Sequence, residues 1–459
     1  MTLHEHIYPA TGKSNAQVVL AGAQEIDQAV AAAKVAQRQW ISLTAEQRRD
    51  LLINLADVVH EHLDELAALN VQDYAVPISY AGNAVLLERF LRHYAGYIDK
   101  PLGSSNPGPA DLNLIEREPY GVVAVIAPWN GALVVAASCL APALAAGNAV
   151  VFKPSELAPL ASLRFGELCS EAGLPPGLVG VVPAGAAGGD ALVRHPGIGK
   201  VAFTGGADTA RRVLCSATEN LTPVITELGG KSANLVFADA DLDAAAALSA
   251  HQGPLMQSGQ SCACASRLLV QDGVYDAFLE KFLRVIGSAV IGDPLDPTVT
   301  FGPVISQSAA DRILAAIDEA TASGATLLTG GRRMNGSLTS GFYIEPTVLA
   351  DVDNSSAIAQ TETFGPVVSV IRFSDDDEAV RLANDSVYGL NAFIHTRDLA
   401  RAHRVARQLE SGSVWVNTFS DISPQGPYGG YKHSGSGRTG GLEGLQEFLQ
   451  VKNIRLALA

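Results

Sequence analysis

Residues 121–152 read GVVAVIAPWNGALVVAASCLAPALAAGNAVVF, and this uncharged stretch decides the fold. It is long enough to resemble a membrane span, but Pro128, Asn130, Pro142 and Asn148 divide it into short pieces. No piece reaches the roughly 20 unbroken apolar residues that a spanning helix needs. The pieces have the lengths of a strand, a helix and a second strand, which indicates a buried β-α-β unit of a parallel sheet.

Similar units continue on both sides of this stretch. From about Asp27 to Asn70 apolar residues recur at helical spacing, which predicts amphipathic surface helices. Short β-rich runs then alternate with alanine-rich segments, and this predicts a doubly wound α/β domain. The runs are GVVAVIAP, AVVFKP, LVGVVP, KVAFTG and PVITEL. A second series follows Lys231 and predicts a separate lobe, with NLVF, SRLLV, TLLTG, VVSVIRF, AFIHT and SVWVN as its strands.

Two further segments read as a projecting element. PLGSSNPGPADLN is rich in turn residues and precedes the extended run LIEREPY, which predicts a hairpin, and the final LQEFLQVKNIRLAL predicts a helix and a strand. We therefore expect three units. They are a cofactor-binding domain (1–99 and 119–229), a catalytic domain (230–433) and a bridging or oligomerisation element (100–118 and 434–459), whose exposed backbone edges would pair between subunits.

The composition excludes several classes of protein. The 459 residues carry a formal net charge of -15, with 47% hydrophobic and 17% charged residues. Such an acidic globular chain is poorly suited to nucleic acid or an anionic membrane. The opening MTLHEHIYPATGK lacks the charged and apolar segments of a leader peptide, so we expect a cytoplasmic protein. Its 5 cysteines are too few and too scattered for a disulfide scaffold.

The run SGQSCACASR, residues 258–267, is the sharpest local candidate for chemistry. It is a polar, glycine-containing loop, so Cys262 could face a cleft. A buried and unreactive thiol is the commoner fate of a single cysteine, and this segment alone favours that interpretation. A metal site at Cys262 and Cys264 is weaker still, because no second Cys or His pair lies at ligand spacing.

Other runs along the chain reverse this balance in favour of a catalytic cysteine. They are APWN, KPSE, FTGG, ITELGGKS, ETFGPV and PYGGYKHSGSGR. In this order and at these spacings they resemble the NAD(P)-dependent aldehyde dehydrogenase superfamily, and the resemblance extends from YPATGK to the final tail. It implies oxidation of an aldehyde to a carboxylic acid, on an α/β fold with a Rossmann-type cofactor domain and a second α/β catalytic domain. It also implies a homodimer or homotetramer.

The same resemblance assigns the catalytic roles. Cys262 is the nucleophile, which forms a thiohemiacetal and, after hydride leaves for the nicotinamide, a thioester. The Asn130 side chain and the backbone N–H of Cys262 stabilise the oxyanion. Glu227 matches the general base that activates water. Relatives that transfer the acyl group to coenzyme A typically lack this carboxylate, so Glu227 favours release of a free acid.

The resemblance also assigns the cofactor site. Lys153 and Glu156 contact the adenosine ribose, where a glutamate would repel a 2′-phosphate. NAD is therefore expected, although NADP stays possible because some relatives with the KPSE run use it. Glu362 and Phe364 hold the nicotinamide ribose, and a small residue at Gly206 stands where serine is usual. The other expected cofactor-binding residues are Pro128, Trp129, Gly205 and Leu228.

Several positions depart from the family pattern. The lysine and glutamate often proposed as a proton path are here Cys139 and Thr439, so proton removal from Glu227 is expected to use water. Gly131 and Ser138 replace large aromatics, which predicts a wide tunnel for bulky aromatic or long aliphatic aldehydes. The expected lining residues are Gly131, Ser138, Met256, Ile422 and Tyr428. Asp421 leaves a polar or cationic substrate open.

Two alternatives remain at this point. An NADP-dependent or CoA-acylating semialdehyde dehydrogenase would share the fold, and Glu156 and Glu227 argue against it. A non-catalytic protein with the same fold is disfavoured because Cys262, Glu227 and Asn130 are all present.

Overall fold

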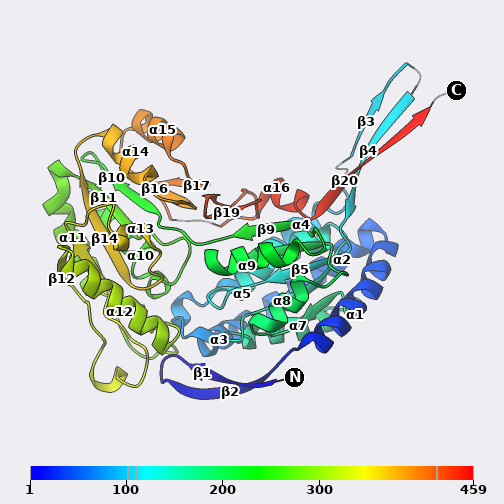
Figure 1. Ribbon diagram of the computed structural model, residues 1–459, viewed down its shortest axis with the longest axis horizontal. Helices are drawn as coiled ribbons and strands as arrows, with labels where there is room; N and C mark the ends of the chain where they lie inside the picture. The colour runs from blue at the N-terminus through cyan, green and yellow to red at the C-terminus, as the bar shows by residue number, and fades with distance from the viewer. Residues whose placement is uncertain (1, 101–102, 110, 420–421, 458–459) are drawn as a thin grey trace.

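The computed structural model describes residues 2–100, 103–109, 111–419 and 422–457. It contains two open, mainly parallel sheets, each at the centre of its own lobe (Figure 1). Both sheets combine parallel strands with connecting helices, so the predicted α/β class is confirmed. No helix within these described ranges is long and apolar enough to cross a membrane.

The first lobe is built on the uncharged stretch and its neighbours. Its parallel strands lie in the order β9-β8-β5-β6-β7, and β19 (Gly435–Ser436) adds to β9 in the antiparallel sense. The parallel strands are β5 (Val122–Ile126), β6 (Ala149–Lys153), β7 (Val179–Val181), β8 (Lys200–Thr204) and β9 (Val224–Glu227). Every residue of β5 and β6 is buried, because helices cover both faces of the sheet.

Two groups of helices surround this sheet. The connecting helices are α5 (Ala132–Val135), a π-helical turn (Ala136–Leu140), α6 (Ala141–Ala145), α7 (Leu160–Glu171), α8 (Ala186–Val193) and α9 (Ala207–Ala217). Before them come α1 (Ala23–Ser42), α2 (Ala45–Glu61), α3 (Leu63–Tyr74), the turn η1 (Ile78–Tyr80) and α4 (Asn83–Ala95). Helix α1 buries Ile26, Val30, Ala33 and Trp40 at helical spacing, as the amphipathic pattern predicts. The Trp40 indole N–H donates to the Leu144 carbonyl at 2.9 Å, which ties α1 to α6.

The second lobe has a seven-stranded sheet in the order β12-β13-β14-β11-β10-β16-β17. Its strands are β10 (Ala233–Val236), β11 (Arg267–Gln271), β12 (Thr326–Thr329), β13 (Thr347–Ala350), β14 (Val367–Phe373), β16 (Asn391–His395) and β17 (Ser413–Val416). The helices are α10 (Leu242–Gln252), α11 (Tyr275–Gly287), α12 (Gln307–Ala322), α13 (Ala357–Gln360), α14 (Asp376–Asn384) and α15 (Leu399–Gln408). The sequence did not predict β13, which is only four residues long.

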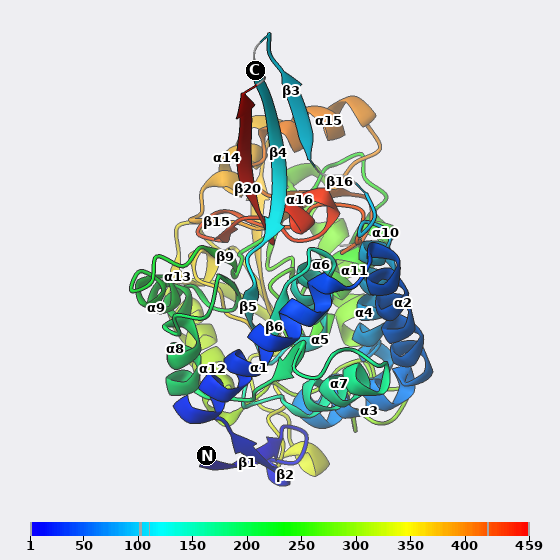
Figure 2. The ribbon, with the colours of Figure 1, turned by 90° about the vertical axis from the view of Figure 1, so that its right-hand side faces the viewer.

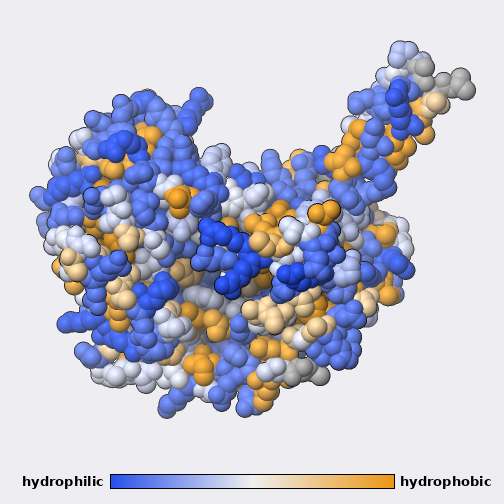
Figure 3. All heavy atoms as spheres, in the orientation of Figure 1, coloured by the Kyte–Doolittle hydropathy of each residue, from blue (hydrophilic) through white to orange (hydrophobic). Residues whose placement is uncertain are grey.

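A three-stranded arm projects from the first lobe (Figure 2). It consists of β3 (Ser104–Pro107), β4 (Asp111–Pro119) and β20 (Leu449–Ala457), and β4 pairs antiparallel with both neighbours. Apolar residues on its surface are visible in Figure 3, and Val451 and Leu456 of β20 are exposed. Residues 101–102, 110 and 458–459 of the predicted bridging element lie outside the described ranges.

The structure differs from the predicted boundary at residue 434. Strand β19 joins the first sheet, and α16 (Gly441–Gln446) buries Leu445 in the core of the first lobe, so the arm receives the C-terminal tail only from Leu449 onward. A separate short sheet is formed by β15 (Tyr388–Gly389) and β18 (Tyr431–Lys432), which pair in the antiparallel sense.

An N-terminal hairpin that the sequence did not predict connects the two lobes. It consists of β1 (Thr2–Tyr8) and β2 (Lys13–Leu20). His6 hydrogen-bonds the Leu157 carbonyl of the first lobe at 3.0 Å, and the Pro9 carbonyl accepts the Phe342 N–H of the second lobe at 3.0 Å. Most of its residues are not buried, so it lacks the apolar alternation that indicates a strand.

Candidate active site

The order of the first sheet creates a crevice between β5 and β8. The chain runs from β5 outward to β6 and β7, and then returns to β8 on the other side of β5. Open α/β sheets bind dinucleotides at the carboxyl ends of their strands where the order reverses in this way. A cavity of about 550 Å³ lies at this place and is lined by the segments that follow β5, β8 and β9.

Most of the predicted cofactor-binding residues line this cavity. They are Pro128, Trp129, Gly205, Gly206, Leu228, Glu362 and Phe364. Lys153 and Glu156 are not among its lining residues but lie one strand further along, at the end of β6. There the Lys153 Nζ is 3.9 Å from Glu156 Oε2, and burial lowers the Lys153 pKa.

A second cavity, of about 250 Å³, is lined by every residue that the sequence predicted for the substrate tunnel. These residues are Gly131, Ser138, Met256, Ile422 and Tyr428. Asp421, which the sequence left open as a further contact, lies outside the described residues.

The two cavities meet at the predicted catalytic residues. Asn130, Glu227 and Cys262 line both of them. These residues come from the loop after β5, the end of β9 and the loop before β11, so only the packing of the two lobes brings them together. The arrangement leaves a thiol, an amide and a carboxylate between a large cleft and a smaller, mostly apolar one.

The loop that carries Cys262 has an unusual backbone. Gln257, Ser258 and Gly259 all have positive φ, at 49°, 55° and 71°. Such conformations persist where surrounding contacts impose them. Here the Ser258 hydroxyl donates to the Gly302 carbonyl at 2.7 Å. The Gln260 side chain accepts the Ile305 N–H at 2.8 Å and donates to the Pro303 carbonyl at 3.1 Å, which anchors the loop.

Cys262 is partly exposed as a residue, yet its sulfur lies in a poorly solvated place. Burial raises the thiol pKa to about 12, and the nearby Glu362 and Glu227 carboxylates add to this effect. A hydrogen bond from Tyr428 acts in the opposite direction. The thiolate needed for nucleophilic attack is therefore disfavoured by the surroundings and depends on local donors.

Glu227 ends β9 with only 9% of its surface exposed. Burial raises its pKa well above the usual range, Glu447 contributes in the same direction, and Arg438 lowers it. Its Oε2 has no hydrogen-bond partner among the described residues. A carboxylate with a free acceptor beside a cavity can take a proton from a water molecule there.

Asn130 is fixed by the loop that carries the thiol. One N–H of its side-chain amide donates to the Gln260 carbonyl at 2.9 Å. A side-chain amide has a second N–H, which could donate to an acceptor in the adjoining cavities. This geometry suits an oxyanion hole next to Cys262.

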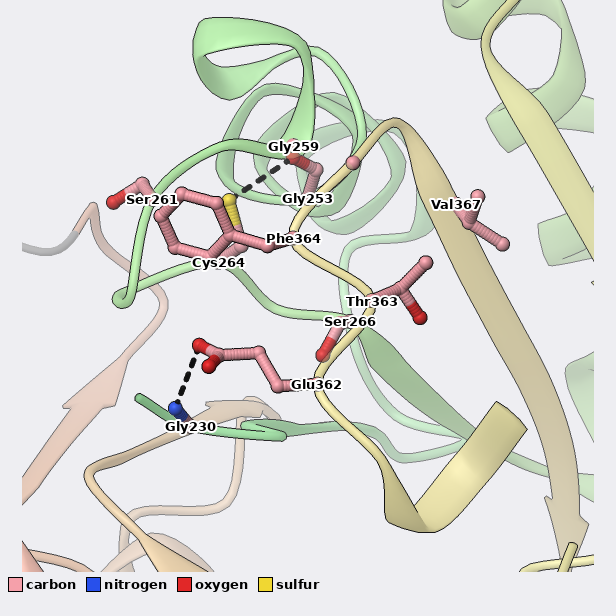
Figure 4. A pocket seen from close by; sticks show the side chains of 11 residues that line it. Gly230, Gly253, Gly259, Ser261, Cys264, Ser266, Glu362, Thr363, Phe364 and Val367 are labelled. Atoms are coloured by element: carbon pink, nitrogen blue, oxygen red, sulfur yellow. Dashed lines mark hydrogen bonds between the residues drawn. The ribbon is translucent and has the colours of Figure 1, made fainter. Parts of the chain in front are cut away.

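Glu362 is held close to the chain that follows β9 (Figure 4). Its carboxylate accepts the Gly230 N–H at 3.0 Å, and a Cβ on Gly229 would lie only 1.9 Å from Glu362 Oε2. Phe364 has a φ of 49° and packs edge-on against Trp129, with ring centroids 5.6 Å apart. In the same view the Cys264 thiol donates to the Gly253 carbonyl at 3.5 Å.

Two functional candidates were missed by sequence reasoning. Lys231 is buried, donates to the Thr363 hydroxyl at 3.2 Å, and has a pKa lowered to about 7 by burial. Arg312 on α12 donates to the Thr363 carbonyl at 2.6 Å. Together they hold the segment that contains Glu362. Lys231 stands in the run ITELGGKS, whereas no local pattern marks Arg312.

The positions of the altered proton path are both buried. Burial raises the Cys139 pKa to about 12, so this thiol is neutral. Thr439 donates to the Tyr428 carbonyl at 3.4 Å and lines the smaller cavity.

The comparisons with known proteins agree with this geometry. The sequence matches the aldehyde dehydrogenase family over residues 2–454, and the chain therefore belongs to this family. It is similar to PnpE from Pseudomonas sp. WBC-3, with 39% identity and a TM-score of 0.97 over 100% of this chain and 94% of that one. It is also similar to betaine aldehyde dehydrogenase from Staphylococcus aureus in complex with NAD+, with 36% identity and a TM-score of 0.96 over 99% of this chain and 91% of that one.

These findings define the chain as an NAD(P)-dependent aldehyde dehydrogenase, an oxidoreductase.

Proposed function

We propose that this protein oxidises a bulky, uncharged aldehyde to the free carboxylic acid with NAD, through a thioester on Cys262. The observation that carries the proposal is that Cys262, Asn130 and Glu227 line both cavities. An aldehyde in the smaller cavity and a dinucleotide in the larger one would meet at these residues.

The first half-reaction uses Cys262 and Asn130. The Cys262 thiolate attacks the carbonyl carbon, a C–S bond forms, and the carbonyl oxygen becomes an oxyanion. The Asn130 amide and the Cys262 N–H donate to that oxygen. When bound, the oxidised cofactor accepts the hydride from the same carbon. This step leaves the acyl group on Cys262 as a thioester, and the oxyanion reverts to a carbonyl.

The second half-reaction uses Glu227. Its carboxylate takes a proton from water, the water oxygen attacks the thioester carbonyl, and the C–S bond breaks to release the acid and the thiolate. Because burial raises the pKa of Glu227, the active carboxylate form becomes abundant only as the pH rises. Deacylation is therefore expected to slow on the acidic side.

The lining of the smaller cavity supports an uncharged substrate. Most of its wall is apolar, from Leu86, Pro128, Val134, Val135, Met256, Leu390 and Ile422. Among its described lining residues Glu227 is the only Asp, Glu, Lys or Arg, and Tyr428 provides the only aromatic ring. A quaternary ammonium group is normally held by several aromatic faces. We therefore place the substrate in a different class from the betaine aldehyde named for the S. aureus relative.

A substrate panel tests this proposal. Purified protein with NAD is assayed by the absorbance of the reduced cofactor against benzaldehyde, a long aliphatic aldehyde, acetaldehyde and betaine aldehyde. We expect the first two to give the highest kcat/KM. A strong preference for acetaldehyde or betaine aldehyde would overturn the substrate assignment.

A second assay tests the fate of the acyl group. The product is identified with and without added coenzyme A, and Cys262→Ser serves as the inactive control. We expect the free acid in both cases. An acyl-CoA product, or full activity in Cys262→Ser, would contradict the mechanism.

We also propose that the arm mediates homo-oligomer formation. It projects from the first lobe with unpaired edges at β3 and β20, and with exposed Val451 and Leu456. Unpaired edges of this kind favour pairing with another chain. Val451→Lys is expected to lower the sedimenting mass measured by analytical ultracentrifugation, and an unchanged mass would argue against this role.

A further inference from the structure

His6, in the N-terminal hairpin that contacts both lobes, is enclosed, with only 1% of its surface exposed. Its Nδ1 lies 2.5 Å from the side-chain oxygen of Asn15 on β2. Its Nε2 lies 3.1 Å from the Asp73 carbonyl near the end of α3 and 3.0 Å from the Leu157 carbonyl after β6. Both ring nitrogens therefore face oxygen atoms.

These contacts determine the protonation of the ring. A carbonyl oxygen only accepts hydrogen bonds, so Nε2 must carry a proton. The orientation of the Asn15 amide follows from its other contact: its Nδ2 donates to the Gln72 carbonyl at 3.1 Å, which directs its oxygen to His6. Nδ1 must then carry a proton as well. A histidine with a proton on each nitrogen is an imidazolium, which has a positive charge.

Asp73 neutralises this charge. Its carboxylate lies 3.8 Å from His6 Nε2, and the residue is as deeply buried as the ring, with 1% exposed. The two carboxylate oxygens accept the backbone N–H groups of Leu160 and Ala161 at 2.8 and 2.9 Å, where α7 begins. Burial raises the pKa of Asp73, and the two N–H groups and His6 act against this effect, so the carboxylate form depends on these partners. The amide and carbonyl oxygens that face the ring from β2 and from the segment after β6 carry no charge.

The buried pair holds the segment 154–159, which connects β6 to α7. His6 binds the backbone carbonyl that follows Glu156 in the chain, and Asp73 binds the first N–H groups of α7. Glu156 lies in this segment, and its Oε2 is 3.9 Å from the Lys153 Nζ at the end of β6. The direction of the Glu156 carboxylate therefore depends on a backbone that the His6–Asp73 pair fixes from α3 and from the hairpin.

We propose that His6 is a positioning residue for the cofactor: as an imidazolium paired with Asp73, it holds the segment 154–159 so that the Glu156 carboxylate faces the adenosine ribose of the dinucleotide. The proposal rests on the expected role of Glu156 in the proposed function. The pair makes and breaks no bond of the reaction, so its loss weakens cofactor binding and leaves the chemical steps unchanged.

His6→Gln tests the proposal because it keeps a side-chain N–H donor and removes the charge. Calorimetric titration should give a dissociation constant for NAD about three- to tenfold higher than that of the parent, since a charge-assisted contact is lost. At saturating NAD and aldehyde, kcat should stay within about twofold of the parent value. The control is His4→Gln, the same change two residues earlier on β1 at a half-buried position, which should bind NAD like the parent.

Asn15→Ala provides a second variant, at an exposed position. It removes the acceptor of the Nδ1 proton and leaves the ring in place, so it should weaken NAD binding in the same direction by a smaller factor. Raising the pH removes one of the two ring protons. The NAD affinity of the parent should therefore fall at alkaline pH, and His6→Gln should lack this component of the pH profile.

Dissociation constants for NAD in His6→Gln and Asn15→Ala that equal the parent value overturn the proposal, as does an equal loss of affinity in His4→Gln. A failure of the expected role of Glu156 is seen separately, because the parent would then bind NAD and NADP equally. With the segment displaced, His6→Gln should bind NAD and NADP with more similar affinities than the parent does.

Discussion

Burial raises the pKa of both Cys262 and Glu227, and this shared effect sets how the site responds to pH. Both groups react as anions, so each needs partners that lower its pKa. A hydrogen bond from Tyr428 acts in this direction on the thiol, and the charge of Arg438 acts in this direction on the carboxylate. The pKa values of Cys262 and Glu227 can therefore be changed separately by substitution.

Replacing Glu227 by glutamine should separate catalysis from stability. Removing a general base is expected to slow deacylation about 100- to 10,000-fold, with the acyl-enzyme visible by mass spectrometry. The folded-state pKa of Glu227 lies above its unfolded value, so its stabilising contribution is complete in acid and is lost as the pH rises through the folded pKa. Glu227→Gln should therefore be more stable than the parent at alkaline pH, by about 1 to 3 kcal/mol. If the parent and Glu227→Gln have equal melting temperatures both in acid and in alkali, this prediction is contradicted.

Replacing Arg438 should change the pH below which deacylation slows. Its positive charge lowers the pKa of Glu227, so Arg438→Gln raises that pKa further and requires a higher pH for the carboxylate form. The rate at which the protein hydrolyses a chromogenic ester that acylates Cys262, measured against pH, shows directly where deacylation slows. Arg438→Lys keeps the charge and is the control. If the rate falls at the same pH in the parent, Arg438→Gln and Arg438→Lys, the charge of Arg438 does not affect the pKa of Glu227.

At the scale of the element, the loop after β8 leads into α9 and borders the larger cavity. Gly206 is the N-cap of α9, with extended backbone and no heavy atom within 4 Å of where a Cβ would stand. Gly229, after β9, has no such room because Glu362 fills the space. A side chain therefore fits at position 206 but not at position 229, although both glycines border the same cavity.

This difference predicts contrasting results for two substitutions. Gly206→Ser should change the free energy of unfolding by only a few tenths of a kcal/mol, since serine is also a good N-cap. Gly229→Ala should displace the Glu362 carboxylate from the Gly230 N–H, and we expect weaker binding of NAD with a similar melting temperature. Calorimetric titration measures the affinity of both variants for NAD. Equal affinities would show that the position of Glu362 does not matter for the cofactor.

On the scale of the whole molecule, the larger cavity is lined by both lobes, from Gly205 on one side to Glu362 on the other. A ligand in such a cleft stabilises the native state as a unit. The N-terminal hairpin contacts both lobes and the arm projects away from the first lobe, and neither is among the described residues that line this cavity.

Thermal unfolding should therefore distinguish the cofactors. NAD at 100 times its Kd should add about 2.7 kcal/mol of stability. NADP at the same concentration should add less, because the Glu156 carboxylate would repel a 2′-phosphate. In Glu156→Gln, which removes the charge with little change in shape, the two melting curves should approach each other. A parent protein that is stabilised equally by both cofactors would overturn the expected preference.

Much of the fold could be predicted from the sequence because its strands and helices follow from patterns within short stretches of residues. Strands β5 and β6 are continuous apolar runs, and α1 repeats its apolar residues at helical spacing. The N-terminal hairpin was not predicted because most of its residues are exposed and show no apolar alternation, and β13 was not predicted although it is as short and as fully buried as β10. The arm was placed from residue 434 rather than 449, since hydrogen bonding of Gly435 to β9 leaves no local mark.

The sequence by itself determined the α/β class and the family, and it supplied the thiol, the amide and the carboxylate for which we propose catalytic roles, since motifs and periodicity are properties of neighbouring residues. Only the tertiary structure decided that Cys262, Asn130 and Glu227 line the same two cavities, that Tyr428 lines the smaller one, and that Gln260, Lys231 and Arg312 hold the surrounding loops. The physical reason is that these contacts join residues far apart in the chain, so that tertiary packing within and between the two lobes, rather than any local preference, sets their distances.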